Sequence, residues 1–197
     1  MRCVRLSHNV NDNTAVNRTH TSYSLLQGPS TQLDTAAITC HVVYVHGSGP
    51  SSDDTIFDAS TGASFGVYWG KGDPRNTSQS VQGSNQTQHI ATLEAIIHVL
   101  STSQRLEGRL EIHTASQYAV RACSTWRLVW IKNGWKTARN DPVKHQDSLK
   151  KILELEHHRL GPTIYKHISG SDAAEGRVEA AKLAASPFQT RRQGTRG

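Results

Sequence analysis

The order of its strand-like and helix-like stretches limits the folds open to this chain. Residues 40–46 are β-rich and end in a Gly-Ser-Gly-Pro run, and two more strand-like stretches follow at residues 63–69 and 78–82. From there, helix-like and strand-like stretches are interleaved. An antiparallel opening followed by this mixture predicts an α/β fold, in which helices flank a five-stranded mixed sheet.

The remaining elements of that fold follow from residue spacing. We expect strands at residues 109–114 and 163–168, and helices at residues 88–100, 116–131, 143–158 and 175–185. The first helix carries its apolar residues at helical spacing, and they are Leu93, Ile96, Ile97 and Leu100. Ser116 stands where an N-cap belongs, because its hydroxyl can accept a hydrogen bond from the first turn. The predicted order is βββαβααβα.

The two ends of the chain differ in composition from its centre. Residues 1–38 are rich in Ser, Thr, Asn and His, so we expect a disordered or loosely ordered N-terminal segment. We expect the folded domain over residues 39–186. Residues 187–197 are rich in arginine and should form a basic C-terminal tail.

Charge and cysteine content bear on partners and compartment. Lys and Arg number 22 against 16 Asp and Glu, so the formal net charge is +6, which favours polyanionic partners such as nucleic acid. The three cysteines are too sparse for a disulfide framework or a metal-ligand set and suit a reducing compartment. No stretch approaches the ~20 apolar residues of a membrane span. We expect an intracellular protein, cytoplasmic or nuclear, with a mitochondrial location left open by the N-terminal arginines.

Four segments carry a more specific resemblance. They read Val-Tyr-Val-His-Gly-Ser at residues 43–48, Ala-Thr-Leu-Glu-Ala-Ile at 91–96, His-Thr-Ala-Ser-Gln-Tyr at 113–118 and Val-Glu-Ala-Ala-Lys-Leu-Ala at 178–184. In order and motif they resemble type 1 ribonuclease H of the eukaryotic kind, which cuts RNA in RNA–DNA hybrids. The resemblance covers about residues 40–185 and implies a ribonuclease H-like fold.

The resemblance also implies a metal site that this chain lacks. Where the family carries Asp, Glu, Asp and Asp, this chain has His46, Thr92, Ala115 and Ala181. In the family those acids hold two Mg²⁺ ions, which carry out the cleavage. Mg²⁺ prefers oxygen ligands, so we expect neither a bound cofactor nor a catalytic residue here. A family histidine that helps product leave corresponds to Ser171.

Nearby acids do not rebuild the set. Glu94 lies two residues after Thr92, and on a helix it should point to roughly the opposite side. Glu179 stands in the same relation to Ala181. Asp53, Asp54 and Asp58 belong to an expected loop and should be solvated.

The family's contacts to nucleic acid are kept only in part. Its hybrid-gripping Arg-Gln-Thr-Asn-Gln pattern reads Asn-Gln-Thr-Gln-His at residues 85–89. The basic protrusion, residues 125–137, grips the DNA strand in the family and is better preserved. The residues that we expect to contact nucleic acid are Thr87, Gln88, Trp130, Lys132, Asn133, Trp135, Lys136, Thr137 and Lys144. Packing is the alternative role for the tryptophans; it is favoured for Trp126 and Trp130, whereas Trp135 also suits stacking on a base or sugar.

Three functions remain open at this point. The leading hypothesis is a catalytically inactive ribonuclease H-like protein that binds RNA–DNA hybrid or double-stranded nucleic acid, mainly through its phosphates. The second is a protein-interaction or structural module that uses the fold as a scaffold. The third is an active ribonuclease with non-standard metal ligands.

Overall fold

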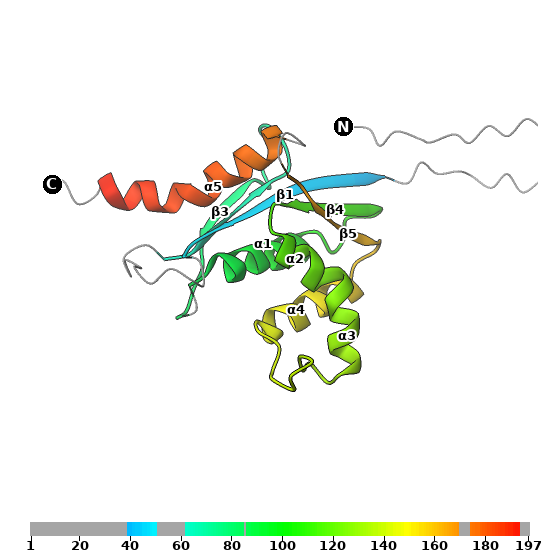
Figure 1. The fold of residues 1–197 in the computed structure, drawn as a ribbon. Helices are drawn as coiled ribbons and strands as arrows, with labels where there is room; N and C mark the ends of the chain where they lie inside the picture. Colours follow the sequence, from blue (N-terminus) through cyan, green and yellow to red (C-terminus); the bar gives the residue numbers. More distant parts are fainter. Residues whose placement is uncertain (1–38, 51–61, 85, 170–173, 194–197) are drawn as a thin grey trace, which may run out of the picture. The chain divides into compact units, whose positions relative to one another are not determined.

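A five-stranded mixed sheet forms the centre of the fold (Figure 1). The computed structural model describes residues 39–50, 62–84, 86–169 and 174–193. The strand order is β3–β2–β1–β4–β5. The central strand β1 (Cys40–Ser48) pairs antiparallel with β2 (Ser64–Tyr68) and parallel with β4 (Arg109–Thr114). The edge strands are β3 (Thr77–Ser80) and β5 (Thr163–His167). The predicted fold class is confirmed.

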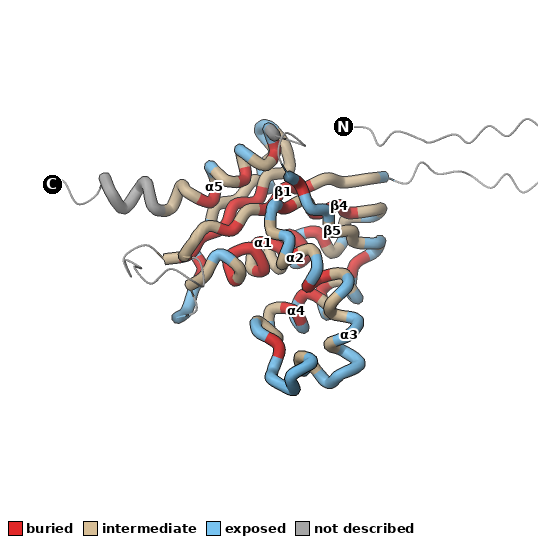
Figure 2. The backbone as a smooth tube through the Cα atoms, viewed as in Figure 1, coloured by how far each residue is buried: buried red, intermediate tan, exposed pale blue. Residues whose placement is uncertain are grey.

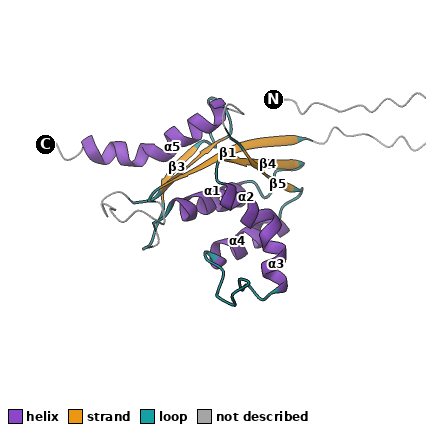
Figure 3. Ribbon diagram, in the orientation of Figure 1, coloured by secondary structure: helices purple, strands orange, loops and turns teal. Residues whose placement is uncertain are grey.

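Helices cover both faces of this sheet (Figure 3). One face carries α5 (Ala174–Gln193), which contacts β1, β2 and β3. The other carries α1 (Gln88–Thr102), against which α4 (Gln146–His157) packs. Alternation along β1 separates the two cores, since Val43 and Val45 join the α1 side whereas Tyr44 joins the α5 side.

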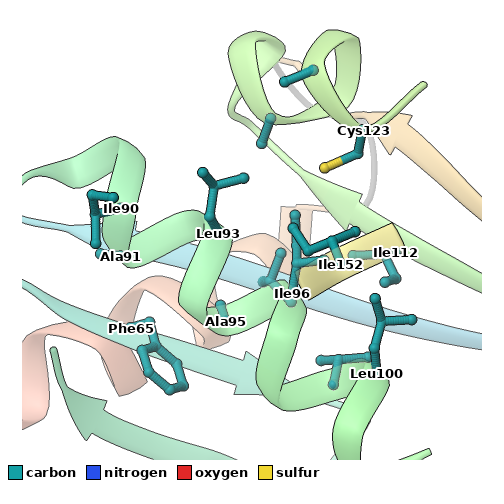
Figure 4. Close-up of a cluster of buried hydrophobic side chains, with 14 of the residues drawn as sticks. Phe65, Ile90, Ala91, Leu93, Ala95, Ile96, Leu100, Ile112, Cys123 and Ile152 are labelled. Atoms are coloured by element: carbon teal, nitrogen blue, oxygen red, sulfur yellow. The ribbon is translucent and has the colours of Figure 1, made fainter. Parts of the chain in front are cut away.

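The main core lies between the sheet and α4, with α1 in the middle. Ile96, Leu100, Ile112 and Ile152 are all buried in this cluster (Figure 4). Burial of each such side chain stabilises the fold by about 1.5–3 kcal/mol. Because α1 is covered on both sides, its buried residues extend beyond the expected apolar stripe to Ala91 and Thr92.

The helical stretch after β4 is interrupted by a π turn. Ser116 caps it as predicted, because its Oγ accepts a hydrogen bond from the Ala119 N–H at 3.2 Å. The stretch comprises α2 (Gln117–Arg121), a π turn (Ala122–Trp126) and α3 (Arg127–Lys132). Cys123 is buried in the π turn, and burial raises the pKa of its thiol to about 12.

The expected start of α4 at Val143 is wrong, since the helix begins at Gln146. The Val143 N–H donates to the Trp135 carbonyl oxygen at 3.0 Å, so this residue belongs to the loop after α3. His145 then takes a left-handed conformation with φ of 59°, which cannot continue into an α-helix at that residue. Tertiary contacts therefore shorten the helix.

The last helix continues past its expected end. We expected it to stop at Ala185, but it runs through Pro187 to Gln193 and so into the expected tail. Pro187 has no N–H for the Leu183 carbonyl, and Ser78 on β3 donates its hydroxyl to that oxygen at 2.5 Å instead. The hydroxyl of Ser64 donates to the next carbonyl, that of Ala184. Within the described residues, no helix is long and apolar enough to cross a membrane.

Candidate functional site

The structure brings to one end of the sheet the four positions that the resemblance assigns to the family's acids. His46 lies near the end of β1, Thr92 on α1, Ala115 directly after β4, and Ala181 on α5. A hollow of about 250 Å³, the α1 hollow, is lined by His46, Thr92 and Ala115 among others. A second hollow of about 650 Å³, the α5 hollow, is lined by His46 and Ala181 among others. His46 therefore borders both hollows. Ser171 lies outside the described residues.

The α1 hollow lies beside a place where β1 and α1 pack closely together. Gly47 lies against the helix so closely that an added Cβ would stand 2.4 Å from the Thr92 backbone nitrogen. Thr92 is buried, and its hydroxyl donates to the Gln88 carbonyl oxygen at 2.9 Å. Ala115 offers no polar side-chain atom. The one hydroxyl among these altered positions is thus already used within its own helix.

The α5 hollow has a basic wall. Its lining residues include Arg177 and Lys182 and, like those of the α1 hollow, include no carboxylate among the described residues. Burial, and next the charge of Arg177, lower the pKa of His46 below its ordinary value. A neutral imidazole therefore sits beside a guanidinium at this end of the sheet.

The candidate replacement acids point elsewhere. Glu94 accepts a hydrogen bond from the Ser148 hydroxyl on α4 at 3.3 Å and does not line the α1 hollow. Glu179 pairs with Lys182 at 2.7 Å. Asp53, Asp54 and Asp58 lie outside the described residues.

Magnesium does not fit the residues at this end of the sheet. Within the part of the chain that the structure describes, no group of three or more His, Cys, Asp or Glu side chains is arranged to hold a metal ion. His46 offers a nitrogen, and Thr92 a neutral hydroxyl that already donates to its own helix. Mg²⁺ binds carboxylates, phosphates and water rather than such donors, so no step of cleavage follows from these residues.

The expected nucleic-acid contacts in and beside the basic protrusion fall into two groups. The loop between α3 and α4 is mostly exposed (Figure 2). The exposed contacts in and beside it are Lys132, Asn133, Lys136 and Lys144. The half-buried ones are Trp130, Trp135 and Thr137. Both tryptophans pack against the main core, and the Trp135 N–H donates to the Trp130 carbonyl oxygen at 2.6 Å. The charges, and not the rings, are therefore presented outward.

The two nucleic-acid contacts expected at the start of α1 differ in their role. The Thr87 hydroxyl accepts a hydrogen bond from the Ile90 N–H at 3.3 Å and so caps the helix. Gln88 is exposed and lines the α1 hollow. Thr87 thus has a structural role whether or not it touches a ligand.

Sequence reasoning missed two features of this region. The first is an aromatic cluster in which Tyr118 meets His89 at 4.5 Å and His145 at 6.0 Å between ring centroids. The contact of Tyr118 with His145 depends on the left-handed backbone of His145, which no sequence pattern indicates. The second is Arg177, and here a signal existed, because residues four apart share one face of a helix and Arg177 stands four before Ala181.

Comparison with known proteins agrees with this geometry. Residues 40–186 match the sequence model of the RNase H family. Ribonuclease H of Schizosaccharomyces pombe is 34% identical over 122 residues, which are 62% of this chain and 44% of that relative. The chain therefore spans less than half of that relative's length.

Solved structures share the fold at lower identity. The PFV RNase H domain aligns with a TM-score of 0.57 and 23% identity, over 74% of this chain and 92% of that one. The foamy viral protease-reverse transcriptase in complex with RNA/DNA hybrid aligns with a TM-score of 0.56 and 22% identity, over 87% of this chain and 22% of that one. With the family match over most of its length, this chain belongs to the RNase H family.

Proposed function

We propose that this chain is a catalytically inactive member of the RNase H family, which binds RNA–DNA hybrid or double-stranded nucleic acid without cleaving it. The observation that carries the proposal is the lining of the two hollows around His46. The fold keeps the end of the sheet where the family holds its metals, yet neither hollow is lined by a carboxylate among the described residues.

The loss of acids bears directly on the chemistry. Two-metal cleavage requires two divalent ions about 3.5–4 Å apart, clamped on the attacking and leaving oxygens. Two dications at that separation repel each other, so several carboxylates are needed to hold them. An imidazole, a used hydroxyl and two alanines do not supply that charge.

Binding requires different groups, and these are present. Lys132, Lys136 and Lys144 are exposed, and the chain carries a net charge of +6. Lysine contacts to phosphates bind nucleic acid of any sequence and weaken as salt rises, because binding releases counterions. The foamy viral relative has been solved with RNA/DNA hybrid and with dsDNA, which supports both duplexes as candidate ligands here.

The proposal is tested by the salt dependence of binding. Fluorescence anisotropy of a short labelled hybrid should report binding by the chain in EDTA, and affinity should fall as salt rises. The triple variant Lys132→Gln/Lys136→Gln/Lys144→Gln should weaken binding roughly tenfold or more and reduce the salt slope by about 2 to 3. Arg105→Gln, at an exposed position after the far end of α1, is the matched control. Equal affinity of the triple variant and the natural chain would refute the proposed surface.

A protein-interaction role is the second candidate, and one observation favours it. Leu128, Val129 and Ile131 on α3 are 59%, 54% and 47% exposed. Apolar residues that gather in one turn form a patch of the kind found at protein interfaces. The same titration separates the two candidates, since a folded chain that binds neither hybrid nor double-stranded DNA would shift support to this one.

A further inference from the structure

We propose that the α5 hollow is a metal-independent phosphate site, in which Arg177, with Lys182 beside it, holds one backbone phosphate of the bound nucleic acid. This inference rests on the proposed function, because a nucleic-acid duplex is the source of the phosphate. It adds a second anchor point, at the end of the sheet, to the lysines in and beside the basic protrusion.

The position of Arg177 is the first argument. Arg177, Ala181 and Ala185 follow one another at four-residue intervals and line the hollow along one face of α5. Alanine at position 181 leaves open the space that a longer side chain would occupy. The Arg177 guanidinium is close enough to His46 for its charge to lower the pKa of that imidazole, after the larger effect of burial.

The state of the guanidinium is the second argument. Arg177 Nε is buried and makes no hydrogen bond within the described residues. Buried donors are paired in most proteins, so this N–H lacks an acceptor, which a ligand oxygen in the hollow lined by Arg177 can supply when the side chain turns toward it. Arginine presents its donors as a planar fork, which matches two oxygens of a phosphate at once.

The charge of the surroundings is the third argument. The hollow is lined by two cations and by the half-buried His46. Lys182 pairs with Glu179 in an exposed helical ion pair, which contributes little and leaves the ammonium free to turn toward an anion. Val178 and Ala185 add apolar walls that reduce competition from water. A fixed guanidinium can hold a phosphate as a metal ion would, but it cannot deliver an activated water, so binding and cleavage become separate.

Two substitutions of Arg177 test the site in the full chain. In EDTA with a labelled RNA–DNA hybrid, Arg177→Gln should weaken binding about fivefold and lower the salt slope by about 1, since one phosphate contact is lost. Arg177→Lys keeps the charge without the fork and should retain the slope with a smaller loss of affinity. Arg105 is exposed after the end of α1 and lines neither hollow, so Arg105→Gln should match the natural chain.

A second pair of variants adds a negative charge beside Arg177 instead of removing the positive one. Ala181→Asp places a carboxylate four residues from Arg177 and should weaken metal-free binding more than the isosteric Ala181→Asn, which fills the same space without the charge. Both variants change an already half-buried position on α5. Circular dichroism establishes that each variant remains folded.

The outcomes separate the two proposals. If the natural chain binds the hybrid and Arg177→Gln binds equally well with the same slope, the phosphate site is wrong and the proposed function stands. If the folded natural chain does not bind, the proposed function fails. In that case inorganic phosphate tests the site alone: a shift of the Arg177 Nε–H resonance supports a site for free phosphate, and no shift overturns the inference. If the natural chain does bind the hybrid, a shift of this resonance with hybrid but none with inorganic phosphate identifies the backbone phosphate as the ligand.

Discussion

The hollows around His46 and the basic protrusion differ in what their residues do. In the hollows close packing dominates, as the buried Thr92 and the tight contact of Gly47 with α1 show. In the protrusion Lys132 and Lys136 are exposed, and these side chains contribute little to packing. Stability and ligand binding are therefore carried by different residues, so mutations should be able to alter one without the other.

The largest expected difference is between two glycines. Gly47→Ala should destabilise the fold by about 3 kcal/mol, because the new Cβ would meet backbone atoms of both Thr92 and Gln88. Gly134→Ala in the protrusion meets no atom within 4 Å and should cost roughly 1–2 kcal/mol, from its left-handed backbone alone. Urea unfolding measures both losses of stability, and equal losses at the two positions would contradict the expected difference.

Arg127 and Lys132 test whether the cations of the protrusion all serve the same role. Arg127 pairs with Glu156, whose carboxylate also accepts a hydrogen bond from the Tyr165 hydroxyl. Arg127→Gln should cost about 2 kcal/mol of stability, because the mostly buried carboxylate loses its charged partner. Lys132→Gln should change stability by less than about 0.5 kcal/mol and act on hybrid binding instead. A large stability loss in the lysine variant would contradict this division.

The contact between β3 and α5 supplies a smaller effect. Ser78→Ala should cost about 1 kcal/mol, because the Leu183 carbonyl loses the donor that stands in for the missing N–H of Pro187. In a Pro187→Ala background the same change should cost less, since a backbone N–H then becomes available. A double-mutant cycle measured by chemical denaturation gives the coupling, and strictly additive effects would rule this explanation out.

The smallest expected effect is a pH dependence of stability. The pKa of His46 is lower in the folded chain than in the unfolded one, mainly through burial. The unfolded state then binds more protons, so stability is complete above about pH 6.5 and is lost as pH falls below it. His46→Asn should make the unfolding free energy less dependent on pH. The dependence that remains should come from His98, His113 and His145, whose pKa values burial also lowers.

Local patterns explain how much of this fold could be predicted from the sequence. The start of α1 at Gln88 and the cap at Ser116 follow from side chains a few residues away. The late start of α4 could not be predicted, because a hydrogen bond between Val143 and Trp135 and the left-handed His145 determine it. Continuation of α5 through Pro187 likewise depends on a distant strand.

The candidate site, too, could be predicted from the sequence only in part. The altered positions were identified from their motifs, and the structure places His46, Thr92 and Ala115 around one hollow. Arg177 was missed, although its helical spacing from Ala181 was visible, because nothing in the sequence indicates that this face meets His46. Which side chains face each other across elements is a tertiary property, and a single sequence records it poorly.

The proposed function depends most on the absence of cleavage. One titration of the chain on a labelled RNA–DNA hybrid, first with Mg²⁺ and then with Mn²⁺, follows binding and cleavage in the same sample. We expect binding in both metals without cleavage in either. Cleavage that accompanies the chain through purification and disappears in a His46→Ala/Thr92→Ala variant would show that this end of the sheet supports the chemistry after all, and would make this chain an active ribonuclease.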